Sequence, residues 1–129
     1  MLEAIASQPN YAAARVWLDA TAMRHQALAA NLANASTPGY QRVDLNADFT
    51  DTLRRELETG HIGNGQNFPL AIETDPTART VGPDGNNVSM EEELQEINQN
   101  ALRYQFMTQY MSMSLKHIET AITGRTQTS

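Results

Sequence analysis

The chain has 129 residues, no cysteine, and 15 Asp and Glu residues against 9 Lys and Arg residues, which gives a formal net charge of -6. This length fits one domain, and the absence of cysteine excludes disulfides, a thiolate nucleophile and a Cys-ligated zinc site. The acidic balance and the scattered basic residues disfavour nucleic acid as a partner. Leu, Ile, Val and Phe make up only 24 of the residues, so we expect a thin core that a partner completes.

The beginning of the chain carries no recognisable targeting segment. Residues 1–9 lack the basic region and the long apolar region of a cleaved signal peptide. No apolar run approaches the roughly 20 residues needed to cross a bilayer. We therefore expect a single unit, residues 1–129, with flexible ends at 1–9 and 125–129, and we expect any export to proceed without a cleaved signal.

Residues 10–35 are predicted to form the N-terminal helix. Ten of the 24 residues from 12 to 35 are alanine, the best helix former. Pro38 prevents the helix from continuing, and Asn34 suits the left-handed conformation that ends a helix. A weak seam with spacings of three and four predicts packing against another helix; it comprises Tyr11, Ala14, Leu18, Thr21, His25, Leu28, Leu32 and Ala35.

The middle of the chain, residues 36–87, holds most of the Gly and Pro residues and is predicted to be irregular and partly extended. Apolar and polar residues alternate from Val43 to Phe49, which favours an extended segment with one covered face. Phe49, Leu53 and Leu57 fit equally well the start of a short helix that stops at Gly60. Residues 60–65 are predicted to be a loop and residues 68–74 a short strand. The pattern leaves the fold of residues 50–83 open.

Residues 88–124 carry the strongest helical signal. Ser89 and Glu92 form a capping box, and residues 91–93 place three carboxylates at the positive end of the helix dipole. Lys116 and Gly124 suit the last turn and the stop. A helix of about 35 residues is roughly 52 Å long. Its apolar seam comprises Leu94, Ile97, Ala101, Tyr104, Thr108, Met111, Leu115, Ile118 and Ile122.

A second apolar stripe, formed by Leu102, Phe106, Tyr110 and Met113, lies beside this seam. One partner helix cannot cover both surfaces. We therefore predict a mainly α fold whose long N- and C-terminal helices form an antiparallel, coiled-coil-like hairpin with minor β structure in the middle. The apolar surface left over is expected to contact other subunits, through Leu18, Leu28, Leu32, Leu94, Ile97, Tyr104, Met111, Leu115 and Ile118.

No pattern in the sequence indicates a catalytic, metal or cofactor site. His25, His61 and His117 are far apart and have no metal-ligand spacing. Helix capping explains the run of residues 91–93 better than an acid-base cluster does, and residues 60–65 lack the ending of a phosphate-binding loop. The residues Met107, Met111 and Met113 fit either core filling or an adaptable contact surface. We predict that the protein is not an enzyme, has no small-molecule substrate and needs no cofactor.

A more specific signal follows the N-terminal helix. Pro38 and Gly39 fit the central positions of a type II turn, which fixes the direction in which the chain leaves the helix. The pattern A-N-x-x-T-P-G-Y after an amphipathic helix resembles the signature of the bacterial flagellar axial proteins, a family of rod, hook and hook-associated proteins. The residues that carry this resemblance are Ala33, Asn34, Thr37, Pro38, Gly39 and Tyr40, with Asp84, Gly85, Asn86 and Val88 similar to the short proximal-rod members.

The resemblance implies a structural subunit of the flagellar basal body that forms the proximal rod on the periplasmic side by helical packing. It also implies export by the flagellar type III apparatus without a cleaved signal, and a requirement for flagellum assembly and motility. The implied partners are copies of the chain itself, other rod proteins, membrane-ring and rod-junction proteins, and the export apparatus.

Two other functions compete with this interpretation. The first is a soluble helical adaptor or export chaperone that binds the amphipathic helix of another chain. The second is a small hydrolase that uses Glu and His, which is disfavoured because this composition encloses a pocket poorly.

Overall fold

The computed structural model describes residues 9–61, 69–79 and 82–124. In chain order the elements are α2 (Pro9–Ala33), β1 (Val43–Leu45), α3 (Phe49–Thr59), β2 (Ile72–Thr74) and α4 (Met90–Thr123). The ends expected to be flexible lie outside the described residues, except that Pro9 opens α2 as its first residue, a position that proline favours.

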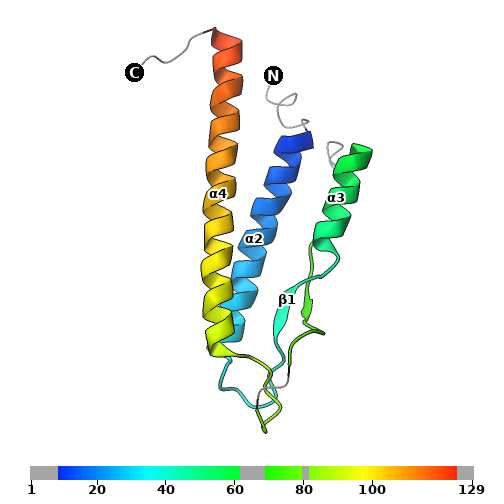
Figure 1. Ribbon diagram of the computed structural model, residues 1–129, viewed down its shortest axis with the longest axis vertical. Helices are drawn as coiled ribbons and strands as arrows, with labels where there is room; N and C mark the ends of the chain where they lie inside the picture. Colours follow the sequence, from blue (N-terminus) through cyan, green and yellow to red (C-terminus); the bar gives the residue numbers. More distant parts are fainter. Residues whose placement is uncertain (1–8, 62–68, 80–81, 125–129) are drawn as a thin grey trace.

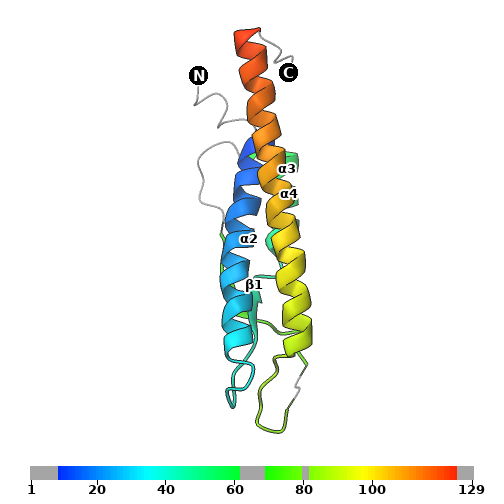
Figure 2. The ribbon, with the colours of Figure 1, turned by 90° about the vertical axis from the view of Figure 1, so that its left-hand side faces the viewer.

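Helices α2 and α4 lie side by side and run in opposite directions (Figures 1 and 2). Three contacts fix this antiparallel register. Asn100 Nδ2 donates to the Thr21 carbonyl over 2.8 Å, Arg24 contacts Glu96 over 2.7 Å, and Asn31 Nδ2 donates to the Glu93 carboxylate over 3.3 Å. The 34 residues of α4 outnumber the 25 of α2, so α4 continues beyond the beginning of α2 (Figure 1). The predicted mainly α hairpin is confirmed.

Helix α2 ends differently from the prediction. Within the described residues only glycines have positive φ, so Asn34 is not left-handed. Its amide N–H instead lies 3.1 Å from the Ala30 carbonyl, and its side-chain amide donates to the same oxygen. The reversal comes later, at Gly39, whose φ is 74°. The Tyr40 N–H bonds the Thr37 carbonyl over 3.2 Å, which confirms the predicted turn.

The middle contains both structures that the sequence left open. Strand β1 pairs antiparallel with β2, with Val43 opposite Thr74 and Leu45 opposite Ile72. Strand β1 stops at Leu45, and α3 begins at Phe49 and ends at Thr59. The next residue, Gly60, caps the helix in the left-handed conformation with φ 72°. Part of the predicted 60–65 loop and part of the 68–74 strand lie outside the described residues.

The apolar core lies on the side of α2 away from α4. Helix α2 is placed between α4 and α3 (Figure 1), and it contacts both helices and β1. The rings of Trp17 and Phe49 meet edge to face with their centroids 5.3 Å apart. The fully buried members are Ala20, Phe49 and Leu53, and the partly buried ones are Val16, Trp17, Leu45, Leu57 and Leu70.

Candidate functional site

The two segments that carry the family resemblance meet at the base of the hairpin. The Gly39 N–H donates to the Asp84 carbonyl over 3.0 Å. The buried side chain of Asn86 donates to the carbonyls of Asn34 and Thr37 over 2.9 and 2.7 Å. The Asn86 side chain thus donates the hydrogen bonds that a neighbouring backbone would otherwise supply to the turn. Two segments that are about fifty positions apart in the sequence therefore form one structure. Sequence reasoning identified both segments but did not predict their contact.

A single buried amide ties this base to α2. Asn31 is fully buried, and its Oδ1 accepts the Val43 N–H over 2.9 Å while its Nδ2 donates to the Val43 carbonyl over 2.7 Å. It therefore pairs with β1 as a neighbouring strand would. The Tyr40 hydroxyl donates to Asn31 Oδ1 over 3.2 Å, so both acceptor positions of this oxygen are used.

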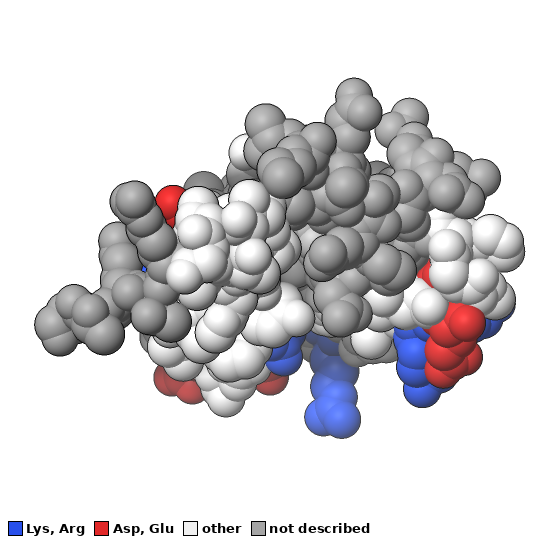
Figure 3. Space-filling view, turned by 90° about the horizontal axis from the view of Figure 1, so that it is seen from above, with Lys and Arg blue, Asp and Glu red and all other residues white. Residues whose placement is uncertain are grey.

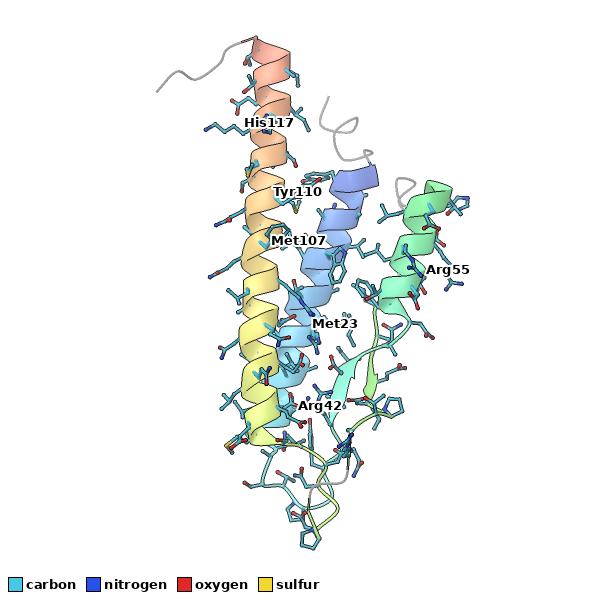
Figure 4. The ribbon with its side chains drawn as sticks, viewed as in Figure 1. Met23, Arg42, Arg55, Met107, Tyr110 and His117 are labelled. Carbon is cyan, nitrogen blue, oxygen red and sulfur yellow. The ribbon has the colours of Figure 1, made fainter. Side chains whose placement is uncertain are left out.

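A network of charged side chains extends from this amide. Arg42, which lies at the base of the hairpin (Figure 4), forms ion pairs with Glu93 and with Asp75, the latter at 2.6 Å. Arg24 holds Asp44 with two hydrogen bonds of 2.8 and 3.0 Å. Together these contacts join the start of α4, the β1–β2 ribbon and the middle of α2. We call the contacts made by Asn31, Arg42, Asp75, Asn86 and Glu93 the junction.

The network shifts the protonation equilibria of its members. Burial by itself raises the pKa of Asp44, but the hydrogen bonds and positive charge of Arg24 outweigh it and hold that pKa below its usual value. Burial also raises the pKa of Asp75, but the hydrogen bonds from Thr77 and Arg42 outweigh it and hold that pKa below its usual value. The pKa of Tyr40 is raised by burial and by the negative charge of Glu93. The lowered pKa values of Asp44 and Asp75 favour the ionised form of these two carboxylates.

The buried position of Glu93 corrects the interpretation of residues 91–93 as a helix-capping run. The sequence assigned residues 91–93 to capping and dipole stabilisation, and Ser89 Oγ does accept the Glu92 N–H over 3.5 Å. Glu91 and Glu92 are exposed, whereas Glu93 is fully buried and paired with Arg42. A buried carboxylate needs such a pair because its desolvation is costly. Glu93 was missed because a run of three acidic residues gives no sign of which one points inward.

The apolar seam of α4 is only partly covered by α2. On α2, Leu28 is fully buried and Leu18 and Leu32 are half-buried. On α4, the residues that α2 buries are Glu93 and Asn100, so the contact face is rotated from the predicted apolar seam. The half-buried seam members are Ile97, Met111 and Ile118, whereas Leu94, Tyr104 and Leu115 remain 47%, 47% and 41% exposed.

The exposed apolar surface continues around α4. Tyr110 is 41% exposed and lies, with the half-buried Met107 and the polar His117, in the half of α4 farthest from the junction (Figure 4). Seen from the end where α4 finishes, that helix is mainly uncharged, while charged side chains gather over α3 (Figure 3). The second predicted stripe is exposed throughout, with Leu102, Phe106 and Met113 each at least 60% accessible. A patch of this kind marks an interaction surface.

The described residues contain neither a candidate metal cluster nor a candidate membrane-spanning helix. Among them, no group of three or more His, Cys, Asp or Glu side chains is arranged to hold a metal ion. No helix within the described ranges combines the length and apolar character that a bilayer span requires. Chemically, the site can order the base of the hairpin and present an apolar helix, which is the action of a structural subunit.

Similarity to known proteins identifies the class of protein to which this chain belongs. A family model described as flagella basal body rod protein matches residues 18–41, which cover the second half of α2 and the turn that enters the junction. This match and the long exposed terminal helix indicate a subunit of the flagellar rod.

Three relatives specify the family. They are each described as flagellar basal body rod protein FlgB, from Aquifex aeolicus (36% identical, covering 86% of this chain and 90% of the relative), Escherichia coli K12 (33%, 77% and 82%) and Salmonella typhimurium (30%, 83% and 88%). The chain belongs to the FlgB family of flagellar basal body rod proteins. Its function is that of a structural subunit of the basal-body rod, which is the predicted function.

Removing the buried amide is expected to destabilise the protein. Asn31→Ala leaves the Val43 N–H and carbonyl without their partners inside the protein, which should lower the free energy of unfolding by about 2–4 kcal/mol. Urea unfolding followed by circular dichroism measures the change. Asn98→Ala, at an exposed position of α4, is the control and should lie within about 0.5 kcal/mol of the parent. Equal stability of the two variants would contradict the role of Asn31.

The ion pairs of Asp44 and Asp75 predict a loss of stability in acid. Because the folded-state pKa values of Asp44 and Asp75 lie below their unfolded values, their stabilisation is present above about pH 4 and is lost as the pH falls through the folded values. Asp75→Asn should make the acid side of the stability profile shallower. Asp51→Asn, which alters a largely exposed ion pair, should leave the profile unchanged. Urea unfolding from pH 7 to pH 2.5 gives the comparison, and identical slopes for Asp75→Asn and the parent would contradict the assignment.

Proposed function

We propose that this chain forms the proximal part of the flagellar rod, on the periplasmic side, where it packs beside copies of itself and other rod proteins. The observation that carries the proposal is the length of apolar surface that α4 leaves uncovered, including Leu94, Tyr104 and Leu115. Helical packing between subunits would bury this surface and add the stability that a thin core lacks. The role requires no chemical step, so we propose that the protein has no enzymatic activity and needs no cofactor.

The remaining partners follow from the same proposal. A proximal rod subunit meets the membrane-ring and rod-junction proteins, and it reaches the periplasm through the flagellar export apparatus without a cleaved signal peptide. The resemblance of residues 84–88 to the short proximal-rod members supports this position. The predicted seam residues of α2 and α4 are proposed to make the subunit contacts.

A strain that lacks this chain tests the proposed position directly. Basal bodies purified from it and viewed by electron microscopy should stop at the membrane ring without a rod, and the cells should be non-motile. Reintroducing the intact gene should restore both. Complete rods and hooks in the strain without the chain would refute the proposal.

A single charge on the exposed surface tests the packing. Leu115→Glu should abolish rod assembly and motility while the purified chain keeps its helical circular dichroism, because Leu115 is 41% exposed and far from the junction. Desolvating an unpaired carboxylate between subunits is costly. Thr50→Glu adds the same charge at an exposed position in the first turn of α3, where the helix dipole favours it, and should leave assembly intact. Normal basal bodies that contain Leu115→Glu would exclude this residue from subunit packing.

A further inference from the structure

A groove whose lining contains no Asp, Glu, Lys or Arg lies between α2 and α4, in the half of each helix that is nearer the junction. It encloses about 410 Å³, within the size range of sites that accept small apolar groups. Ala22 and Ala101, one from each helix, leave room between the larger side chains around them. The lining residues are Thr21, Ala22, His25, Gln26, Asn100, Ala101, Tyr104 and Gln105.

Asn100, one of the residues that line this groove, has a buried polar atom without a partner among the described residues. Asn100 is 1% exposed, and its Nδ2 donates to the Thr21 carbonyl over 2.8 Å. Its Oδ1 is buried and accepts no hydrogen bond from any described residue. A buried acceptor without a donor is costly. A group that enters the groove with an N–H donor would remove this cost.

The exposed stripe of α4 has the complementary chemistry. Leu102, Phe106 and Met113 are 65%, 64% and 60% exposed, and the amides of Gln99 and Gln109 flank them in the sequence. Phe106 lies about 140° around the helix from the groove residue Ala101. The stripe and the groove are therefore different faces of one helix at the same level along its axis.

We infer that the stripe of one copy of this chain packs into the groove of the neighbouring copy. Leu102 and Phe106 enter the groove, and a flanking amide donates to Asn100 Oδ1. Because two different surfaces meet, each copy keeps a free groove on one side and a free stripe on the other. Such a heterologous contact continues from copy to copy into a ring or a helix, as a rod wall requires, and does not close into a pair.

A second copy of the chain fits the groove because neither contacting surface carries a charged residue and because the groove lies away from the exposed carboxylates at the start of α4. Neither the groove lining nor the stripe contains an Asp, Glu, Lys or Arg residue, so copies that lie side by side meet here without repulsion. Contact at the junction end would instead bring together the exposed carboxylates of Glu91 and Glu92. The inference rests on the proposed function, since it names the surfaces through which rod subunits contact each other.

Cysteine crosslinking in assembled basal bodies tests the contact, since the parent chain has no cysteine. A chain with both Ala101→Cys and Phe106→Cys replaces the parent in cells, and basal bodies are purified and oxidised with copper phenanthroline. The expected result is a ladder of disulfide-linked dimers, trimers and larger oligomers of this chain. Each single-cysteine variant should remain monomeric on the gel. The pair Ala101→Cys with Arg55→Cys, in which Arg55 lies on α3 (Figure 4), is the matched control and should also give no ladder.

Gln105→Cys with Leu102→Cys probes the same two surfaces independently and should also give the ladder. A dimer formed by Ala101→Cys alone, or crosslinks only to a different rod protein, would overturn the inference. If these variants restore motility and rods but neither pair crosslinks, the groove contact is refuted while the proposed function stands. If the strain without the chain builds complete rods, the proposed function itself fails.

Discussion

The burial of Glu93 beneath Arg42 and Asn31 is the constraint on which the rest of the structure depends. A carboxylate removed from water must be paired and hydrogen-bonded, and here its partners come from the end of α2 and from the segment that enters β1. The start of α4 is therefore held where these two segments meet. Asn86 and Gly39 bring the 84–88 segment to the same place. The buried Glu93 side chain and the contacts around it thus hold together α2, the start of α4 and the segment that enters β1.

The polar nature of this base explains how a protein with a thin core leaves so much apolar surface exposed. Both residues of α4 that become fully buried, Glu93 and Asn100, are polar, so α2 and α4 recognise each other through specific hydrogen bonds. The apolar residues of α4 that stay exposed, such as Leu94, Leu102 and Phe106, form the surface that we propose contacts other subunits. Under the proposed packing, a monomer built in this way gains further hydrophobic stabilisation on assembly. Polar contacts within the chain and an exposed apolar helix surface suit a rod subunit, because such a subunit folds as a separate chain before it assembles.

Helix α2 has to fit between two neighbours, and its composition reflects this position. Alanines at 13, 14, 20 and 27 are buried, and their small side chains allow α4 and the α3–β1 unit to approach from opposite sides. Trp17 fills the wider space against Phe49. A helix covered on two sides shows no single apolar face, which is why the seam predicted for α2 included only part of its buried surface.

The sequence by itself determined the features that depend on local chemistry. Alanine content and the Ser89 cap indicated the two long helices, Pro38 and Gly39 indicated the turn, and residues 33–40 indicated the family. The tertiary structure alone decided which polar residues lie inside. Asn31, Glu93 and Asn100 are buried only because their partners, distant in the chain, arrive beside them, and a pattern that equates the core with apolar residues cannot detect this. It also decided the rotation of α4, because the residues of α4 that become fully buried are Glu93 and Asn100, which form hydrogen bonds across the hairpin, while its apolar seam is only partly covered.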